Sequence, residues 1–417
     1  MSRFALLLLL LSPLMASAAD PARGELVGLA LLNRNATLPL PADLPQEFRI
    51  SGKYTSGTRT ERIHSVEGKS KGRPTGAFVP LLGQPLQGIS DAQWMADGTV
   101  WTITDNGFGA KSNSRDAMLS LKRVRPDFKK GTVTRIETLY LRDPDHVLPF
   151  PLAVESNEGW LSGADLDPES FRFVGDRLWI GDEFGPYLVE FTTDGRAIAV
   201  HPAVREGQRI CSADTSATDC AIAIGRSKGF EGLAVSGDGR TLYAMLEAPL
   251  PGNDALTILE FDLGQRSWTG RHWSYTPLRK GSAVGALSWS ANNELLLIER
   301  DDGEGLLAPP CPHDAPETMC FREPALHKVL VRVRLNAQGQ AEPLRSTDLL
   351  HIKNPGRLGG FGNEYAMPFW TIETVARVGR TRVLIANDNN FPFSASRSPN
   401  RQDDTEFALI EVGELFR

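Results

Sequence analysis

The chain has 417 residues, 45 basic and 51 acidic side chains, a formal net charge of −6 and a pI of about 5.8. Its basic residues lie in short, scattered groups, so it lacks the concentrated positive surface that binding to nucleic acid requires. Its 39 glycines and 28 prolines favour many turns and short strands over long helices.

The N-terminus has the pattern of a secretory signal peptide. Arg3 precedes an apolar segment at 4–11 with six consecutive leucines, and Ala-Ser-Ala at 16–18 is typical of a cleavage site. The apolar segment is shorter than the roughly 20 residues that span a bilayer, which argues against the alternative of a membrane anchor. We therefore expect a signal peptide at 1–18 and an exported mature chain, 19–417, without a membrane span, in the periplasm or secreted.

A weak internal repeat follows, in which an apolar strand, a Gly or Asp turn and a second strand that ends in an acidic residue recur. The five segments are 88–107, 169–183, 230–247, 284–302 and 371–388. Each is followed by another strand-like segment, and three- or four-stranded sheets that recur along a chain are typical of propeller blades.

The repeat predicts an all-β fold with a single propeller domain over 19–417. Strands at 25–32 and 47–55 could supply a further blade or close the ring, which gives about six blades. A multi-sheet sandwich has similar strand statistics, but the shared shape of the five segments favours the propeller.

Acidic residues recur at both ends of these hairpins. Examples are Glu169 with Glu183 and Glu231 with Glu247; Asp91 with Asp105 and Glu373 with Asp388 follow the same pattern. Because the first and last residues of an antiparallel hairpin lie side by side, the repeat predicts that carboxylates gather on one face of the ring. Acids that simply flank turns and stay solvated are the alternative, and that explanation fits Asp97, Asp176 and Asp238 better than the strand-end acids.

Oxygen ligands without histidine suit Ca²⁺, with Mg²⁺ as the alternative. The candidate metal ligands are Asp91, Asp105, Asn106, Glu169, Asp182, Glu183, Glu231, Glu247, Glu299 and Asp388.

The four cysteines fall in two pairs with equal spacing, Cys211 with Cys220 and Cys311 with Cys320. Four cysteines allow three connectivities, and in an exported chain we expect the two local disulfides. A zinc site is the rival interpretation, and the absence of a CxxC motif argues against it.

Several segments resemble the phytase-like family, described as "esterase-like activity of phytase", of exported bacterial proteins. They are SDAQWMADGTVWTITDNGFGAKSNSRDA, DLDPESFRF, GDEFGPYLVEF, GFEGLAVSGDGRTLYAML and ANDNNFPF, within a likeness that covers about 75–415. The resemblance implies a β-propeller related in fold to calcium-dependent phytases and to propeller lactonases and esterases. The positions that match the family's motifs are Asp105, Asn106, Asp165, Glu169, Asp182, Glu183, Glu231 and Asp388.

Our first functional hypothesis is a metal-dependent hydrolase of small phosphoesters that acts as a monomer. In it, Asp105, Glu183, Glu231 and Arg300 are the catalytic candidates. Lys111, Arg115 and Lys228 would pair with the substrate's phosphate oxygens, and Tyr187 would shape the pocket. The dense acidic and lysine-rich site of true propeller phytases does not align with this sequence, so the resemblance does not extend to phytate as the substrate. A Ca²⁺-dependent propeller lactonase or carboxylesterase is the second hypothesis, and a non-catalytic binding propeller of the cell envelope is the third.

Overall fold

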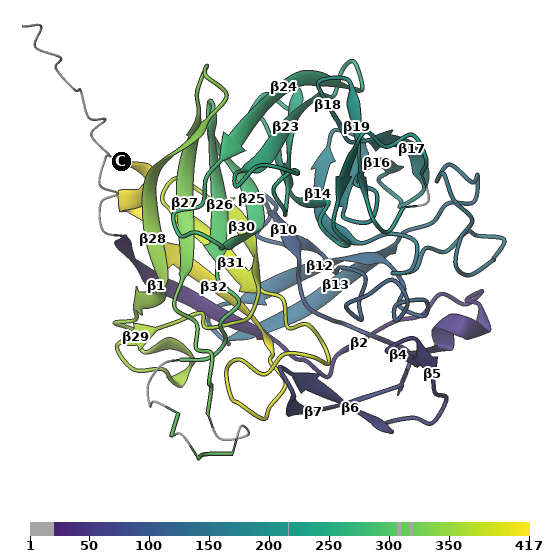
Figure 1. Cartoon of the computed structure of the whole chain (residues 1–417). Helices are drawn as coiled ribbons and strands as arrows, with labels where there is room; N and C mark the ends of the chain where they lie inside the picture. The colour runs from purple at the N-terminus through teal and green to yellow at the C-terminus, as the bar shows by residue number, and fades with distance from the viewer. Residues whose placement is uncertain (1–20, 216, 307–310, 313, 317–319) are drawn as a thin grey trace, which may run out of the picture.

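The computed structural model describes residues 21–417 apart from 216, 307–310, 313 and 317–319, so the expected signal peptide lies outside the described residues. The described chain folds almost entirely into β-strands, and its only helical elements are the short 3-10 helices η1 (Gln46–Arg49), η2 (Leu358–Gly360) and η3 (Gly413–Phe416) (Figure 1). Among these residues no helix is long and apolar enough to cross a membrane.

Most of the strands form five antiparallel sheets of four strands each. Sheet 1 contains β10 (Asp91–Trp94), β11 (Val100–Ile103), β12 (Ser120–Asp127) and β13 (Thr132–Tyr140). Sheet 2 contains β14 (Pro168–Val174), β15 (Arg177–Asp182), β16 (Tyr187–Thr192) and β17 (Ala197–Pro202). Sheet 3 contains β21 (Phe230–Val235), β22 (Thr241–Leu246), β23 (Leu256–Asp262) and β24 (Ser267–Tyr275).

The last two sheets come from the C-terminal part of the chain, with one strand from the N-terminus. Sheet 4 contains β25 (Ala283–Ala291), β26 (Glu294–Arg300), β27 (Lys328–Leu335) and β28 (Ala341–Lys353). Sheet 5 contains β30 (Ile372–Val378), β31 (Arg382–Asn387), β32 (Thr405–Glu411) and, from the N-terminus, β1 (Ala22–Leu32).

The hairpin turns lie where the sequence predicts them. Gly98 and Gly239 have φ of +77° and +70°, a backbone conformation that glycine adopts without steric cost, and each follows an aspartate. Side chains alternate between the two faces of each strand, so every sheet buries apolar residues on both faces against its neighbours.

The five sheets close into a ring. The first strands of the sheets, β10, β14, β21, β25 and β30, contact one another in that order, and β30 also contacts β10. Each pair of neighbouring sheets shares an apolar core; Ile103 with Phe171 joins sheets 1 and 2, and Phe407 with Val100 joins sheets 5 and 1. The predicted all-β propeller is therefore confirmed.

The described strands form five blades rather than the expected six or so. Residues 25–32 close the ring, which is one of the two roles expected for them, and residues 47–55 form no blade. Residues 25–32 lie within β1, which pairs antiparallel with β32 from Leu32↔Thr405 to Glu25↔Glu411 and so completes sheet 5. Residues 47–55 form only a 3-10 turn and short strands outside the ring.

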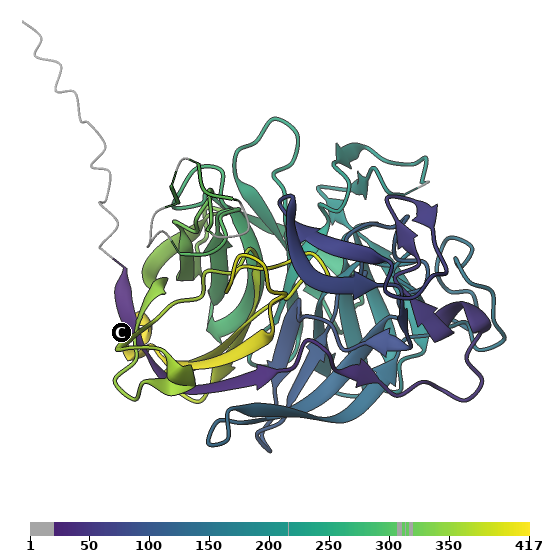
Figure 2. The same cartoon turned by 90° about the horizontal axis from the view of Figure 1, so that it is seen from below.

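Short strands between β1 and sheet 1 form a separate N-terminal layer, which lies below the five sheets in Figure 1. They are β2 (Thr37–Leu38), β3 (Ile50–Ser51), β4 (Tyr54–Thr55), β5 (Thr58–Arg59), β6 (Val66–Ser70), β7 (Arg73–Val79), β8 (Leu81–Leu82) and β9 (Gln84–Pro85). Figure 2 shows the same layer from below. Three further strands precede sheet 3, β18 (Val204–Arg205), β19 (Gln208–Ser212) and β20 (Ile222–Ile224), and β29 (Glu364–Tyr365) pairs with β28.

Closure of the ring by β1 gives a stability test on two adjacent residues. Ala30 is 0% exposed, in the core between sheets 5 and 1, whereas Leu31 is 40% exposed. We expect Ala30→Glu to lower the free energy of unfolding by about 3–5 kcal/mol, because it buries an unpaired charge. Leu31→Glu is the matched control, with an expected change within about 0.5 kcal/mol in urea unfolding. Equal effects of the two variants would contradict this account of closure.

Candidate functional site

Three glutamates occupy the same structural position at the start of the first strands. In β14, β21 and β30 the register of pairing skips one residue, and the skipped residues are Glu169, Glu231 and Glu373. Such a β-bulge breaks the alternation of side chains and re-aims one of them. In β25 the skipped residue is Gly285, which has no side chain to contribute.

A second group of charged residues lies where the second strand of each hairpin ends. Glu183, Glu247 and Asp388 directly follow β15, β22 and β31, and Asp105 lies two residues after β11. In sheet 4 the equivalent residue is Arg300, the last residue of β26, so one blade supplies a cation where the others supply an acid.

These side chains line one cavity of about 520 Å³. Eight carboxylates face it, together with four cationic side chains and the aromatic residues Phe108, Trp370 and Phe393. The carboxylates are those of Asp105, Asp167, Glu169, Glu183, Glu231, Glu247, Glu373 and Asp388. The cations are Lys69, Lys71, Lys228 and Arg300.

Within this cavity the acids form two compact clusters. In the first, carboxylate oxygens of Asp105, Asp167 and Glu169 lie within 4.8 Å of one another. In the second, those of Glu183, Glu231 and Glu247 meet the same limit. We call them the Asp105 cluster and the Glu231 cluster.

The backbone is shaped to admit these acids. A Cβ atom added at Gly88 would lie 1.4 Å from Asp388 Oδ1, so only glycine leaves room for that carboxylate. Asp388 Oδ1 also accepts a hydrogen bond of 2.9 Å from the Asn390 amide. The Asp167 carboxylate accepts bonds of 3.1 and 2.8 Å from the backbone and side-chain nitrogens of Asn106.

Burial and mutual repulsion strongly disfavour the charged form of these groups. Burial, reinforced by the charges of Asp105 and Asp182, raises the pKa of Asp167 to about 8. Burial, together with the Glu247 charge, raises the pKa of Glu231 to about 8, and burial with the Asp105 charge does the same for Asp388. The pKa values of Glu169, Glu183 and Glu373 also rise well above the usual range, for the same two reasons.

Different cationic side chains of the protein lie beside the two clusters. Lys228 forms an ion pair with Glu247. Burial lowers the pKa of Lys228, but the charge and hydrogen bond of Glu247 together with the charges of Glu183 and Glu231 outweigh burial, so the pKa is raised. Arg300 Nη2 lies 3.7 Å from Glu247 Oε1. Beside the Asp105 cluster the buried cation is Lys122, which donates to Thr104 Oγ1 at 2.6 Å and whose pKa burial lowers to about 7.

One oxygen of the Glu231 cluster has no hydrogen-bond partner among the described residues. Glu183 Oε1 is fully buried in a side chain that is 5% exposed. A buried carboxylate oxygen without a partner carries a large free-energy cost, which a bound cation or a proton would remove.

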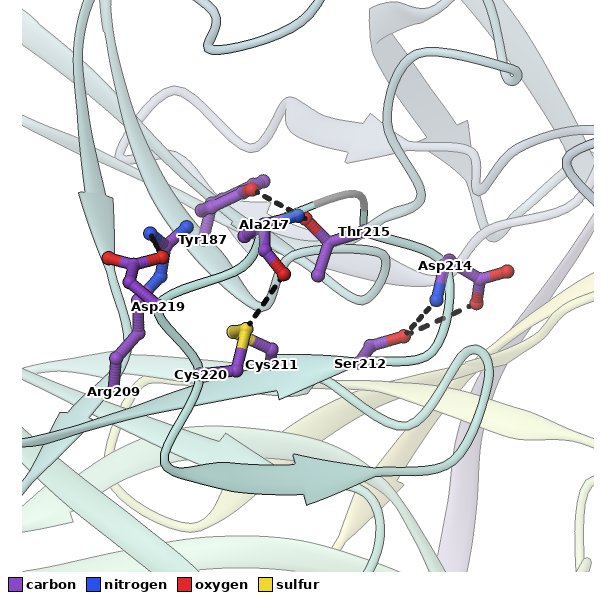
Figure 3. Close-up of a disulfide and its surroundings, with 9 residues drawn as sticks. All are labelled: Tyr187, Arg209, Cys211, Ser212, Asp214, Thr215, Ala217, Asp219 and Cys220. Atoms are coloured by element: carbon purple, nitrogen blue, oxygen red, sulfur yellow. Dashed lines mark hydrogen bonds and ion pairs between the residues drawn. A yellow bond between two sulfur atoms is a disulfide. The ribbon is translucent and has the colours of Figure 1, made fainter.

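A disulfide-bracketed loop, shown in Figure 3, is linked by hydrogen bonds to one edge of the cavity. The predicted Cys211–Cys220 bond is confirmed, and beyond it Ser212 and Asp214 hydrogen-bond to each other. Asp214 Oδ2 accepts a 2.8 Å bond from the Ser227 amide, and Ser227 Oγ in turn donates to Asp167 Oδ2 at 3.2 Å. The loop thus connects a covalent crosslink to the Asp105 cluster. The predicted Cys311–Cys320 bond is also present.

The structure brings most of the candidate residues from the sequence to the cavity. They are Asp105, Asn106, Glu169, Glu183, Lys228, Glu231, Glu247, Arg300 and Asp388. It does not bring Asp91, Asp182 or Glu299 there. Two positions of the hairpins face the cavity, the skipped residue of the first strand and the charged residue at the end of the second strand. Asp91, Asp182 and Glu299 each lie one residue away from such a position.

Those three acids accept other bonds instead. Asp91 is ion-paired with Arg172 and accepts from the Phe171 amide at 2.9 Å, which joins sheets 1 and 2. Asp182 Oδ1 accepts from the Asp167 amide at 2.8 Å, so it orders the segment that carries a cavity acid.

The Glu299 carboxylate has four hydrogen-bonding partners and does not line the cavity. Its carboxylate accepts from Tyr275 Oη and the Leu278 amide, each at 2.8 Å, and from the Arg279 amide at 2.9 Å. The fourth contact is His327 Nε2 at 2.7 Å.

Three candidate substrate-binding residues also lie away from the cavity lining. Lys111 Nζ lies 5.2 Å from the ring centre of Phe184, a cation–π contact, and Arg115 is exposed to solvent. Tyr187 is 2% exposed in the core between sheets 1 and 2, where its hydroxyl meets Thr215 Oγ1 at 3.1 Å.

Sequence reasoning missed Asp167 and the two hairpin lysines of the cavity. Asp167 lies just before β14, so a hairpin alignment that starts at Glu169 passes over it. Lys69 and Lys71 come from the β6–β7 hairpin, outside the repeat altogether.

Comparison with known proteins identifies a family match over residues 84–391, to the phytase-like model described as "Esterase-like activity of phytase". A curated relative from the fungus Arthroderma benhamiae, an "uncharacterized secreted protein", is 28% identical, and the match covers 39% of this chain and 43% of the relative. The chain therefore spans less than half the length of this curated relative.

The solved structures that match this chain have both low sequence identity and low TM-scores. A calcium-binding regucalcin from Agrobacterium tumefaciens is 12% identical, covers 78% of this chain and 92% of its own, and has a TM-score of 0.38. A glycoside hydrolase family 43 β-1,3-galactosidase is 9% identical, covers 84% and 94%, and has a TM-score of 0.40. A putative 6-phosphogluconolactonase from Bacteroides uniformis is 14% identical, covers 81% and 74%, and has a TM-score of 0.33. These scores give no basis for transferring the role of any residue.

The raised carboxyl pKa values predict how stability depends on pH. The Glu231 carboxyl has an ordinary pKa of 4.5 and a folded-state pKa of about 8, so between these values the folded state holds more protons than the unfolded state. Stability from such groups is complete below the unfolded pKa and is lost as the pH rises through the folded pKa. We expect the melting temperature in chelator to fall as the pH rises from 5 to 9.

Two controls accompany that scan. Glu231→Gln removes one titrating group, so its melting temperature should fall less steeply over the same range. Excess Ca²⁺ should flatten the profile of the unmodified protein, because a cation replaces the lost protons. A melting temperature that rises between pH 5 and 9 in chelator would contradict the electrostatic account.

Proposed function

The chain belongs to the phytase-like family described as "Esterase-like activity of phytase", and we propose that it is a Ca²⁺-dependent hydrolase of small phosphoesters. The observation that carries the proposal is the cavity in which eight carboxylates meet cationic side chains. The acids are suited to a divalent cation, and the cations are suited to an anionic substrate.

The Asp105 cluster is the best place for the cation. Three carboxylates converge there within 4.8 Å, Asp388 raises the local negative charge further, and Lys122 is the buried counter-cation. An all-oxygen donor set of this kind favours Ca²⁺, with Mg²⁺ as the alternative. A bound cation would neutralise the carboxylates and polarise the ester of the substrate.

The Glu231 cluster suits substrate binding and proton transfer. Arg300 and Lys228 are both cationic and line the same cavity, so they can bind phosphate oxygens when the substrate displaces their contacts with Glu247. Glu231 has a pKa of about 8, which lets it hold a proton near neutral pH and give it to a leaving oxygen. Glu183, whose pKa also rises well above its usual range, is a second candidate proton donor in this cluster.

We also propose that the protein works outside the cytoplasm as a monomer. Two disulfides, the signal-peptide pattern at 1–18 and the secreted relative support export. The choice between periplasm and full secretion, and the monomeric state, stay predictions.

The second candidate is a Ca²⁺-dependent lactonase or carboxylesterase, which the aromatic lining of Trp370, Phe108 and Phe393 favours. Such a reaction develops one negative charge at a carbonyl oxygen and has less need of cationic side chains. A non-catalytic binding propeller would keep the cation and turn over no ester.

One assay separates these functions. Purified protein would be tested against a phosphomonoester, a phosphodiester, phytate, a lactone and an aryl acetate, in excess Ca²⁺ and in chelator. We expect turnover of a phosphoester that depends on Ca²⁺, and a loss of at least about 100-fold in kcat/KM for Asp167→Asn, because an interaction at the reacting centre is removed. Asp176→Asn, at an exposed turn, is the matched control and should change nothing.

The outcome in Lys228→Ala distinguishes the ester classes. A large loss of activity supports phosphoester hydrolysis, whereas full activity on a lactone or aryl acetate supports the second candidate. A protein that binds Ca²⁺ but hydrolyses none of the five substrates would contradict both.

A further inference from the structure

The β6–β7 hairpin carries a lysine to the mouth of the acidic cavity. Lys69 lies in β6 and Lys71 in the turn that follows, and both line the cavity although the hairpin belongs to none of the five sheets. The family match begins at residue 84, after this hairpin has ended. The hairpin is therefore a part of this chain's cavity that the family match does not cover.

Buried polar contacts fix the hairpin to the rest of the molecule. Arg73 and Glu304 form an ion pair in which the two side chains are 5% and 2% exposed. Ser70 Oγ donates to Glu304 Oε2 at 2.7 Å, and Thr75 Oγ1 donates to the Pro392 carbonyl at 2.7 Å. These contacts hold both strands of the hairpin.

The hairpin also contacts the loop that carries a cavity acid. A Cβ atom added at Gly68 would lie 2.0 Å from the Pro392 carbonyl oxygen, so the two backbones touch at that point. Pro392 lies between Asp388 and Phe393, the two ends of a short segment that lines the cavity. This contact fixes the position of the hairpin relative to the segment that carries Asp388.

Lys69 is an exposed residue between two buried ones, Gly68 and Ser70. Gly68 packs against Pro392 and Ser70 donates a hydrogen bond to Glu304, so the backbone on both sides of Lys69 is anchored. Lys69 therefore lines the cavity from an anchored strand while it stays exposed.

Lys69 differs from the other three cations of the cavity in having no fixed partner. Lys228 and Arg300 contact Glu247, and Lys71 Nζ contacts Glu323 Oε2 at 2.7 Å and the Asp302 carbonyl at 2.6 Å. Among the described residues, the Lys69 side chain makes neither an ion pair nor a hydrogen bond. Its charge is available to a ligand.

We propose that Lys69 is a specificity residue that binds a negatively charged substituent of the substrate at a point remote from the reacting ester. The proposal rests on the proposed hydrolase function of the same cavity. A carboxylate and a phosphate share the chemistry that an ammonium recognises, so either would serve as the substituent. Lys71 is a positioning residue, because its contacts hold the turn of the hairpin.

The test uses two non-hydrolysable probes that differ by one charge, phenylphosphonate and 4-carboxyphenylphosphonate. Their dissociation constants would be measured by calorimetry in excess Ca²⁺. We expect the unmodified protein to bind the carboxylated probe about three- to five-fold more tightly than phenylphosphonate, because one solvent-accessible ion pair adds only a small binding free energy. Lys69→Gln should reduce this ratio to about one, and Lys69→Arg should retain it.

Lys129→Gln is the matched control, since Lys129 is an exposed lysine in the turn after β12. It should leave the ratio unchanged. A ratio that is the same in Lys69→Gln as in the unmodified protein, or failure of both probes to bind, would overturn the proposal. Adding 4-phosphonophenylphosphonate to the series shows whether carboxylate or phosphonate is the preferred substituent.

Hydrolysis is measured in a separate assay with phenyl phosphate and 4-carboxyphenyl phosphate as substrates. If the probes bind with the expected ratio but neither ester is hydrolysed, the assignment of Lys69 stands and the proposed hydrolase function fails. If both esters are hydrolysed and Lys69→Gln leaves their relative kcat/KM unchanged, the hydrolase stands and the role of Lys69 fails.

Discussion

Repulsion among the eight carboxylates that line one cavity is the constraint on which the rest of the site depends. Closing five hairpins into a ring brings their corresponding ends together, so an acid repeated in four of the five hairpins becomes a cluster in space. Such a cluster is costly in the folded state unless protons, internal cations or a bound metal ion offset its charge. The raised pKa values of Asp167, Glu231 and Asp388 reflect this cost.

The repulsion between carboxylates is offset by different cationic side chains in the Glu231 cluster and the Asp105 cluster. At the Glu231 cluster, Arg300 replaces the acid that the other sheets carry, and Lys228 pairs with Glu247. The Asp105 cluster has three converging carboxylates and Asp388 nearby, against the buried Lys122. This asymmetry is the physical basis for assigning the cation to one side and the anionic substrate to the other.

Much of this organisation could be predicted from the sequence because a repeat makes local patterns informative about distant contacts. The hairpin turns and the paired acids at Glu169 and Glu183 both followed from local spacing. The sequence could not show that β-bulges shift the cavity position by one residue. Asp91 and Glu299 each lie one residue away from a position that faces the cavity, so they were expected there and instead contact Arg172 and Tyr275.

Other features depend on contacts between segments far apart in the chain. β1 pairs with β32 across the whole sequence, so local strand patterns could not distinguish a sixth blade from the closing strand of the fifth. Lys69 reaches the cavity only because its hairpin is anchored by Glu304 and Pro392. Residues outside a repeat carry no positional information until the tertiary contacts are known.

Calcium binding measured by calorimetry at pH 7, in buffers of different ionisation enthalpy, tests the central claim most directly. If the acid ring is a cation site, Ca²⁺ binds to the chelator-treated protein and releases protons from the cavity carboxyls, and Asp167→Asn weakens binding while Asp176→Asn does not. Absence of binding heat in every buffer, with a melting temperature that Ca²⁺ does not change, would contradict it.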